Sequence, residues 1–181
     1  MVQYQILGDL EYNFVYQALL VAFEKHEELG DQGLEEVQKN QFNDIALRAD
    51  MECEQAVIHY LRSNRMPIRV FSEEHGRVDI TAGPIYLGVL DGIDGTYVYR
   101  TEKRMGRHAT IFAILRTIDP LYKDYLVSGI MEHATRRMFL VTADRKTVVI
   151  TLGEGVCELG PLCGTLPKEL VGGVLGGAVK Q

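Results

Sequence analysis

The segment 91–96 concentrates the residue types that metal chemistry needs. It reads DGIDGT and directly follows an apolar run, 85–90, which predicts a buried strand. Asp91 and Asp94 stand three residues apart on a tight turn, so each could hold a different ion or both could share one. The Ile93 carbonyl lies between them, and the two glycines would let the backbone turn sharply near a ligand. This segment therefore favours a site for a hard cation.

A second acidic group stands in a matching position. Glu73 and Glu74 follow the predicted strand 68–71 after one intervening residue, Ser72. If the two predicted strands are neighbours, their ends lie about 5 Å apart, and Glu73 could converge with Asp91 and Asp94. Taken separately, each group also fits an ordinary turn or a solvated strand end. Their joint occurrence favours a shared metal site.

Thr96 and the backbone near it add groups that suit an anion. The amides of Gly95 and Thr96 would face a phosphate if a helix or a nest begins there. The chain has 25 Asp and Glu against 19 Lys and Arg, a net charge of −6, so a phosphate would need cations or backbone donors. An EF-hand does not fit, because counting from Asp91 puts Ile93 where a ligand oxygen belongs and Thr96 where a glycine belongs.

Helices precede these acidic groups and strands follow them. Asp9 as a cap predicts a helix at about 9–29, and a second helix opens near Asp50 and ends before Pro67. The helical spacing rests on Leu10, Phe14, Ala18 and Ala22 in the first helix and on Cys53, Val57 and Leu61 in the second. The predicted strands are 68–71, 85–90, 109–118, 126–131, 137–142 and 147–152. Short connections suit hairpins, so we expect an α+β fold with helices packed on a mostly antiparallel sheet.

The sequence LDGIDGT at 90–96 resembles the DPIDGT loop of the inositol monophosphatase family, the lithium-sensitive, magnesium-dependent phosphomonoesterases. Other residues agree with that family in order and spacing. Lys39, Asp44 and Asp50 match a lysine, an aspartate and a helix-opening aspartate, and the pair at 73–74 matches a Glu-Glu pair after a short strand. The resemblance implies the N-terminal α+β part of the inositol monophosphatase and fructose-1,6-bisphosphatase fold.

Carried over residue by residue, the resemblance implies a ligand set for two Mg²⁺ ions. Glu73 and Asp91 would hold the first ion together with the Ile93 carbonyl. Asp91 and Asp94 would hold the second. The cofactor that the resemblance implies is therefore magnesium, bound by oxygen ligands alone.

The resemblance also implies the catalytic groups. Thr96 would help hold the attacking water, and Asp50 and Glu74 would orient that water or Thr96. The amides of Gly95 and Thr96 would receive the phosphate. The implied reaction is in-line attack of metal-activated water on a small-molecule phosphate monoester. Substrates of the family include inositol phosphates, fructose 1,6-bisphosphate and 3′-phosphoadenosine 5′-phosphate.

The chain departs from the family pattern in two ways. Gly92 replaces the proline of the loop, which should loosen the loop. There is no tryptophan, and the chain ends before the family's second domain, which supplies a further aspartate and most substrate contacts. We therefore expect an N-terminal domain over 1–165 and a glycine-rich start of a missing or truncated domain over 166–181. A non-catalytic, truncated binding or assembly module remains the alternative function, and a plain α+β scaffold is a third.

The other residues bear on partners and compartment. The cysteines at 53, 157 and 163 lack CxxC spacing, which favours a reducing, cytoplasmic location. We expect no signal peptide, no membrane span and no nucleic-acid surface, because apolar runs are short and basic residues occur only in pairs. The apolar stretch 170–175 predicts a homodimer or higher homo-oligomer.

The five histidines show no metal-ligand spacing. His26, His59 and His133 stand singly on predicted helices or a hairpin, where a histidine is usually a surface or satisfied core residue. His75 and His108 lie nearer the acidic segment, but no spacing links them. We expect no shared role for these side chains.

Overall fold

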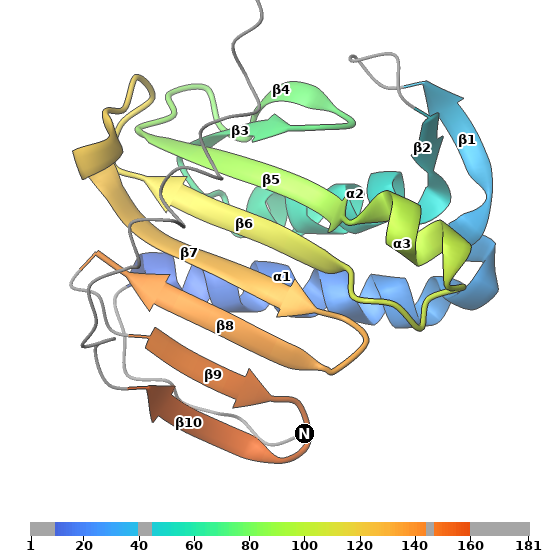
Figure 1. The fold of residues 1–181 in the computed structure, drawn as a ribbon. Coiled ribbons are helices and arrows are strands. Elements are labelled where there is room, and N and C mark those ends of the chain that lie inside the picture. Colours follow the sequence, from blue (N-terminus) through green and yellow to red (C-terminus); the bar gives the residue numbers. More distant parts are fainter. Residues whose placement is uncertain (1–9, 40–44, 144–146, 160–181) are drawn as a thin grey trace, which may run out of the picture.

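The computed structural model describes residues 10–39, 45–143 and 147–159, and their core is one eight-stranded sheet. The strand order is β10-β9-β8-β7-β6-β5-β3-β4. Helices α1 (Leu10–Leu29) and α2 (Arg48–Ser63) lie side by side against one face of the sheet (Figure 1). The expected α+β architecture, with helices packed on a mostly antiparallel sheet, is confirmed.

The strands run close to the predicted ranges, with additions. They are β3 (Ile68–Ser72), β4 (Gly76–Asp79), β5 (Tyr86–Asp94), β6 (Ala109–Leu115), β7 (Tyr125–Glu132), β8 (Arg137–Thr142), β9 (Thr147–Thr151) and β10 (Gly155–Leu159). A separate two-stranded sheet is formed by β1 (Glu36–Lys39) and β2 (Ile45–Leu47). The remaining elements are α3 (Thr96–Thr101) and two 3-10 helices, Gly30–Leu34 and Tyr122–Asp124.

The strand pair β3 and β5 is parallel, whereas every other pair of the large sheet is antiparallel. The pairing runs from Ile68 opposite Tyr86 to Ser72 opposite Leu90. The chain between them forms β4, which pairs with the far side of β3 and so provides the crossover that a parallel pair needs.

The helix α1 buries a different stripe from the one predicted. Leu10 is 66% exposed and Phe14 is only partly buried, although Ala18 and Ala22 are fully buried as expected. The buried stripe is Tyr12, Val15, Tyr16, Ala18, Leu19, Ala22, Phe23 and His26. A strict spacing of four drifts around a helix of 3.6 residues per turn, whereas this stripe alternates steps of three and four. In α2, the predicted residues Cys53, Val57 and Leu61 are all buried.

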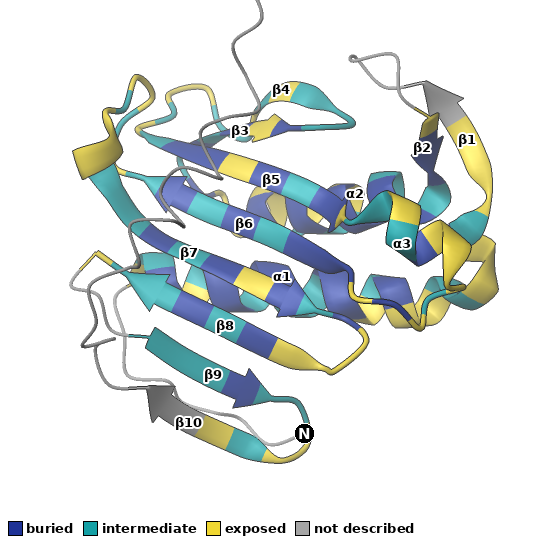
Figure 2. Ribbon diagram, in the orientation of Figure 1, coloured by how far each residue is buried: buried dark blue, intermediate teal, exposed yellow. Residues whose placement is uncertain are grey.

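Burial alternates along the central strands, as Figure 2 shows for β5, β6 and β7. The side facing the helices carries the core residues Val70, Leu90, Phe112, Val127 and Leu140. The opposite side is more open, with Phe71 46%, Val89 47% and Ile130 42% exposed. The core therefore lies between the sheet and the two helices, and it supports the strands β3 and β5 that carry the predicted site residues.

Candidate metal and phosphate site

The ends of β3 and β5 bring the two acidic groups together. Ser72 lies opposite Leu90, so Glu73 and Asp91 leave the paired strands at the same level. The Glu73 amide also donates a hydrogen bond to the Leu90 carbonyl at 3.3 Å. The expectation that these two strands are neighbours is confirmed.

The segment 91–94 is a bulged strand end rather than the loop that the sequence indicated. The strand β5 continues to Asp94, and Asp91 lies opposite Ile111 while Asp94 lies opposite Ala109. One extra residue on β5 creates the irregularity, which bends a strand locally. Ile93 is buried, 1% exposed, whereas Asp94 is exposed and Asp91 is intermediate. The bulge thus places the Ile93 side chain in the core and leaves Asp94 exposed and Asp91 partly buried.

Gly92 has a packing role that the sequence did not reveal. A Cβ atom at this position would lie 2.3 Å from the Asp50 carbonyl oxygen and 3.0 Å from Glu54 Cγ. The first turn of α2 therefore approaches the bulge more closely than any side chain would allow. Here glycine makes the contact between α2 and β5 possible.

Charge and burial together shift the pKa of the central aspartate. Burial, together with the negative charges of Glu73 and Asp94, raises the pKa of Asp91 to about 7. Such mutual repulsion requires that the three carboxylates lie near one another. A divalent cation among them would relieve it.

Asp50 stands behind this group at the start of α2. Its Oδ2 accepts a hydrogen bond from the Leu47 amide at 2.8 Å, which caps the helix. Burial, with a smaller contribution from the charge of Glu74, raises the pKa of Asp50 to about 7 against the lowering effect of that hydrogen bond. Glu74 itself is partly buried on the turn after β3.

Thr96 connects the bulge to Asp50. Its hydroxyl donates to the Ile93 carbonyl at 2.8 Å and lies 3.3 Å from Asp50 Oδ1. Gly95 has a φ of 87°, and α3 begins directly after it at Thr96. The structure therefore brings Thr96, Asp50 and the bulge together, and it places a short helix start at Gly95 and Thr96.

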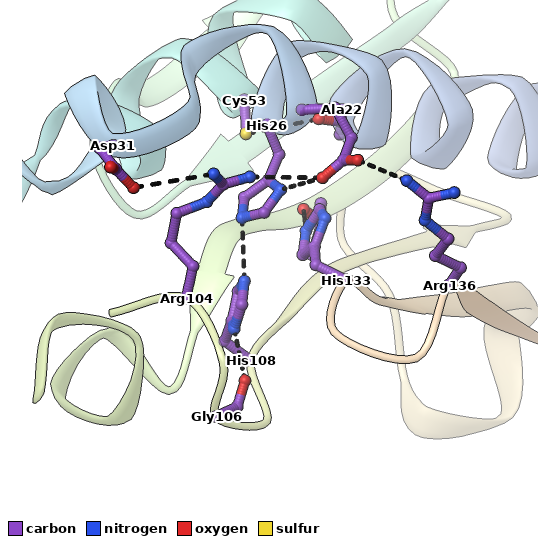
Figure 3. A network of polar contacts seen from close by, with 11 residues as sticks. Ala22, His26, Asp31, Cys53, Arg104, Gly106, His108, His133 and Arg136 are labelled. Atoms are coloured by element: carbon purple, nitrogen blue, oxygen red, sulfur yellow. Dashed lines mark hydrogen bonds and ion pairs between the residues drawn. The ribbon is translucent and has the colours of Figure 1, made fainter. Parts of the chain in front are cut away.

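The structure overturns the expectation that the histidines stand singly. His26 on α1, His108 before β6 and His133 after β7 form one buried cluster (Figure 3). The Nε2 atoms of His26 and His108 lie 2.9 Å apart, and the rings of His26 and His133 stack at 4.1 Å between centroids. Sequence spacing could not reveal this cluster, because each ring comes from a different part of the chain.

The histidine cluster, defined as His26, His108 and His133, reaches the bulge through Thr110. His133 Nε2 lies 2.9 Å from Thr110 Oγ1, and that hydroxyl donates to the Gly92 carbonyl at 2.7 Å. At the other end of the cluster, His26 Nδ1 lies 3.6 Å from Glu27 Oε1. Glu27 also forms ion pairs with the guanidinium groups of Arg104 and Arg136, at 3.4 and 2.8 Å.

Burial lowers the pKa of all three histidines. Burial and the neighbouring His108 together lower the pKa of His26 to about 4, and burial also lowers the pKa of His108. The pKa of His133, 3% exposed, falls well below its ordinary value. These rings are therefore neutral at pH 7.

Some predicted residues lie outside the described part of the chain, and the predicted ligands do not surround a single ion. Asp44 and the stretch 170–175 are not described, and Lys39 is described only as the end of β1. Within the described ranges, no three His, Cys, Asp or Glu side chains are placed to hold one metal ion together. No helix among these residues is long and apolar enough to cross a membrane.

Comparison with known proteins gives a fold and no close relative. No protein-family model matches the chain, and no curated protein sequence matches it. Solved structures do match. The fructose-1,6-bisphosphatase of Leishmania major in its holo form superposes with a TM-score of 0.62 at 15% identity, covering 83% of this chain and 54% of that one.

Two further structures agree. The extragenic suppressor protein SuhB of Bartonella henselae has a TM-score of 0.55 at 17% identity over 83% of this chain and 51% of its own. An inositol monophosphatase–fructose 1,6-bisphosphatase has a TM-score of 0.58 at 16% identity over 81% of this chain and 51% of its own. The chain thus spans about half the length of these structures. The resemblance found in the sequence is confirmed for the fold: this chain is similar to inositol monophosphatase and fructose-1,6-bisphosphatase structures over about half their length.

Proposed function

We propose that this chain carries the metal-binding part of a Mg²⁺-dependent phosphomonoesterase site of the inositol monophosphatase type. One observation carries the proposal. The parallel pair β3 and β5 ends with Glu73 beside Asp91, and the bulge adds Asp94 to the same edge. The fold shared with inositol monophosphatase and fructose-1,6-bisphosphatase structures supports the reaction class.

The residues present fit hard divalent cations by their chemistry. We assign Glu73 and Asp91, with the Ile93 carbonyl, to one Mg²⁺ and Asp91 with Asp94 to a second. Each set needs only two side chains, so it agrees with the finding that no three acidic or histidine side chains among the described residues surround one point. Bound Mg²⁺ would lower the pKa of a water molecule and neutralise negative charge during the reaction.

The protein's own groups would then position the reactants. Because the Thr96 hydroxyl gives its proton to the Ile93 carbonyl or to Asp50, its lone pairs are left to accept a hydrogen bond from the attacking water. Asp50 fixes the orientation of that hydroxyl, and Glu74 would orient the water. The amides of Gly95 and Thr96, at the start of α3, would donate to phosphate oxygens.

The proposal is tested by measuring metal binding first and catalytic turnover second. The full 181-residue chain would be titrated calorimetrically with Mg²⁺ and Mn²⁺, and phosphate release from sugar and inositol phosphates would be measured. Asp94→Asn should remove metal-dependent activity and leave the circular dichroism spectrum unchanged, because Asp94 is exposed and lies outside the core. Equal rates in Asp94→Asn and wild type at saturating Mg²⁺ would overturn the assignment.

A second candidate is a phosphatase-like module that binds metal without turnover. The observation in its favour is that the chain spans about half the length of the solved structures it matches. Metal binding without phosphate release would support this module, whereas binding with release would support the phosphatase.

The remaining assignments concern the surroundings of the site. We propose a small-molecule phosphate ester as the substrate, a homo-oligomeric state and a cytoplasmic location. The net charge of −6 is compatible with an anionic substrate only if cations lie between it and the protein. Light scattering at high concentration tests the oligomer, and a monomer would contradict it.

A further inference from the structure

Glu54 is a fully buried carboxylate that the sequence did not single out. It lies on α2, one helical turn after Asp50, and its exposure is 0%. A buried carboxylate is costly unless hydrogen bonds satisfy it. The hydrogen-bond partners of Glu54 therefore indicate its role in the structure.

The hydrogen-bond partners of the Glu54 carboxylate lie in the segment 72–75, which carries the acidic pair. Its Oε1 accepts a hydrogen bond from the Glu73 amide at 3.0 Å, and its Oε2 accepts one from the Glu74 amide at 3.1 Å. The Ser72 hydroxyl also donates to Oε2. His75 Nδ1 lies 2.9 Å from the same oxygen.

The turn is closed on itself by the same residues. The His75 amide donates to Ser72 Oγ at 3.0 Å, so the serine hydroxyl accepts from the turn while it donates to Glu54. The Glu73 amide divides its proton between Glu54 Oε1 and the Leu90 carbonyl of β5. Glu54 thus ties the end of β3 to α2 at the point where β3 meets β5.

From this network we propose that Glu54 is a positioning residue, which holds the Glu73 carboxylate where it shares a cation with Asp91. The inference rests on the proposed function, because it concerns the first metal position. Glu54 itself points at backbone amides and need not touch the ion. Its two oxygens offer about four acceptor positions, which match the four donors around it.

A glutamine cannot reproduce this arrangement. Its amide keeps one acceptor oxygen but turns an NH₂ group toward N–H donors, so Glu54→Gln should release part of the turn. The turn would then place Glu73 less accurately. Partners that orient metal ligands typically contribute about 10-fold to 100-fold in metal affinity.

The test compares Glu54→Gln with two matched variants of α2 in the full chain. Glu52→Gln makes the same chemical change at a partly exposed residue that forms an ion pair with Arg48. Val57→Ala removes core packing on the same helix without touching the turn. Mn²⁺ affinity is measured by calorimetry under conditions where circular dichroism shows each variant folded, and amide hydrogen exchange at Glu73 and Glu74 is measured without metal.

We expect Glu54→Gln to weaken Mn²⁺ binding at least about 10-fold and to speed exchange at both amides. Glu52→Gln and Val57→Ala should bind Mn²⁺ within about 2-fold of wild type, because lost stability alone does not change the affinity of folded molecules. A Glu54→Gln affinity within that same range would overturn the inference.

Two further outcomes separate this inference from the proposed function. If wild type binds neither Mg²⁺ nor Mn²⁺, both the proposed function and this inference are wrong. If wild type binds and Glu54→Gln binds equally well, only the inference is wrong. If Glu54→Gln does not fold, Ser72→Ala replaces it, since this change removes one donor to Glu54 and the acceptor for the His75 amide. The same loss of affinity is expected, and unchanged affinity in Ser72→Ala would overturn the inference.

Discussion

Two ionisable regions meet the bulge at 91–94 from different sides, and burial acts on them in opposite directions. The carboxylate edge, defined as Glu73, Asp91 and Asp94, faces solvent, and burial with like charge raises the pKa of Asp91 to about 7. The histidine cluster is enclosed, and burial lowers the pKa of its rings. The edge has an excess of like charge that a cation can neutralise, whereas the rings of the cluster are neutral.

Hydrogen bonding in the histidine cluster assigns a neutral form to each ring. Because His108 Nδ1 lies 2.8 Å from the Gly106 carbonyl, it must carry a proton, and its Nε2 accepts from His26 Nε2. The Thr110 hydroxyl donates to Gly92, so it accepts from His133 Nε2. A further proton on His108 would face the proton of His26. The comparison therefore predicts opposite responses to pH.

The largest expected effect is acid destabilisation through the histidine cluster. The pKa of His26 is 6.5 unfolded and about 4 folded, so between these values the unfolded chain binds more protons and stability falls as pH falls. The full difference corresponds to on the order of 3 kcal/mol. Urea unfolding at pH 7 and pH 4.5 should show a larger loss in wild type than in His26→Gln, which lacks the titrating ring.

His59→Gln serves as the control, because His59 is exposed on α2. This variant should keep the pH dependence of wild type. The comparison with His26→Gln also cancels the opposite contribution of Asp50 and Asp91, whose raised pKa values stabilise the folded state as pH falls from about 7. Equal pH dependence in wild type and His26→Gln would contradict the assignment.

An intermediate effect is expected from breaking the connection between the two regions. Thr110→Val removes the hydroxyl between His133 and the Gly92 carbonyl and leaves both groups buried without that partner. The free energy of unfolding should fall by about 2 kcal/mol, measured with urea at pH 7. Thr101→Val is the control, since the Thr101 hydroxyl is exposed and bonds only to carbonyls of its own helix. A similar loss in both variants would argue against the buried link.

The smallest effect is a proton released when Mg²⁺ binds at the carboxylate edge. With a pKa of about 7, Asp91 is half protonated at pH 7, and cation binding should expel about half a proton from it. Calorimetry in two buffers of different ionisation enthalpy measures this release. It should vanish at pH 8.5, and binding at pH 7 without any release would refute the elevated pKa of Asp91.

The sequence allowed the carboxylate edge to be predicted because its residues follow apolar strands. Asp91 directly follows the predicted strand 85–90, Glu73 follows the predicted strand 68–71 after Ser72, and the pairing of these strands brings the two together. The bulge and the role of Gly92 could not be predicted, since they depend on how closely α2 approaches β5. The histidine cluster escaped because residues 26, 108 and 133 meet only through tertiary packing. Glu54 offered one overlooked signal, its spacing of four from Asp50.

The parallel pairing of β3 with β5 has a consequence for the order of folding. From β5 to β10, each strand pairs with the next along the chain. The pair β3 and β5 instead requires β4 to fold outward and α2 to be in place beneath the turn. Because Glu54 on α2 accepts the backbone amides of this turn, we expect Glu73 to reach its place beside Asp91 only after α2 has packed against the sheet. Newly folding chains would then pass through a stage with a native-like sheet and no metal affinity.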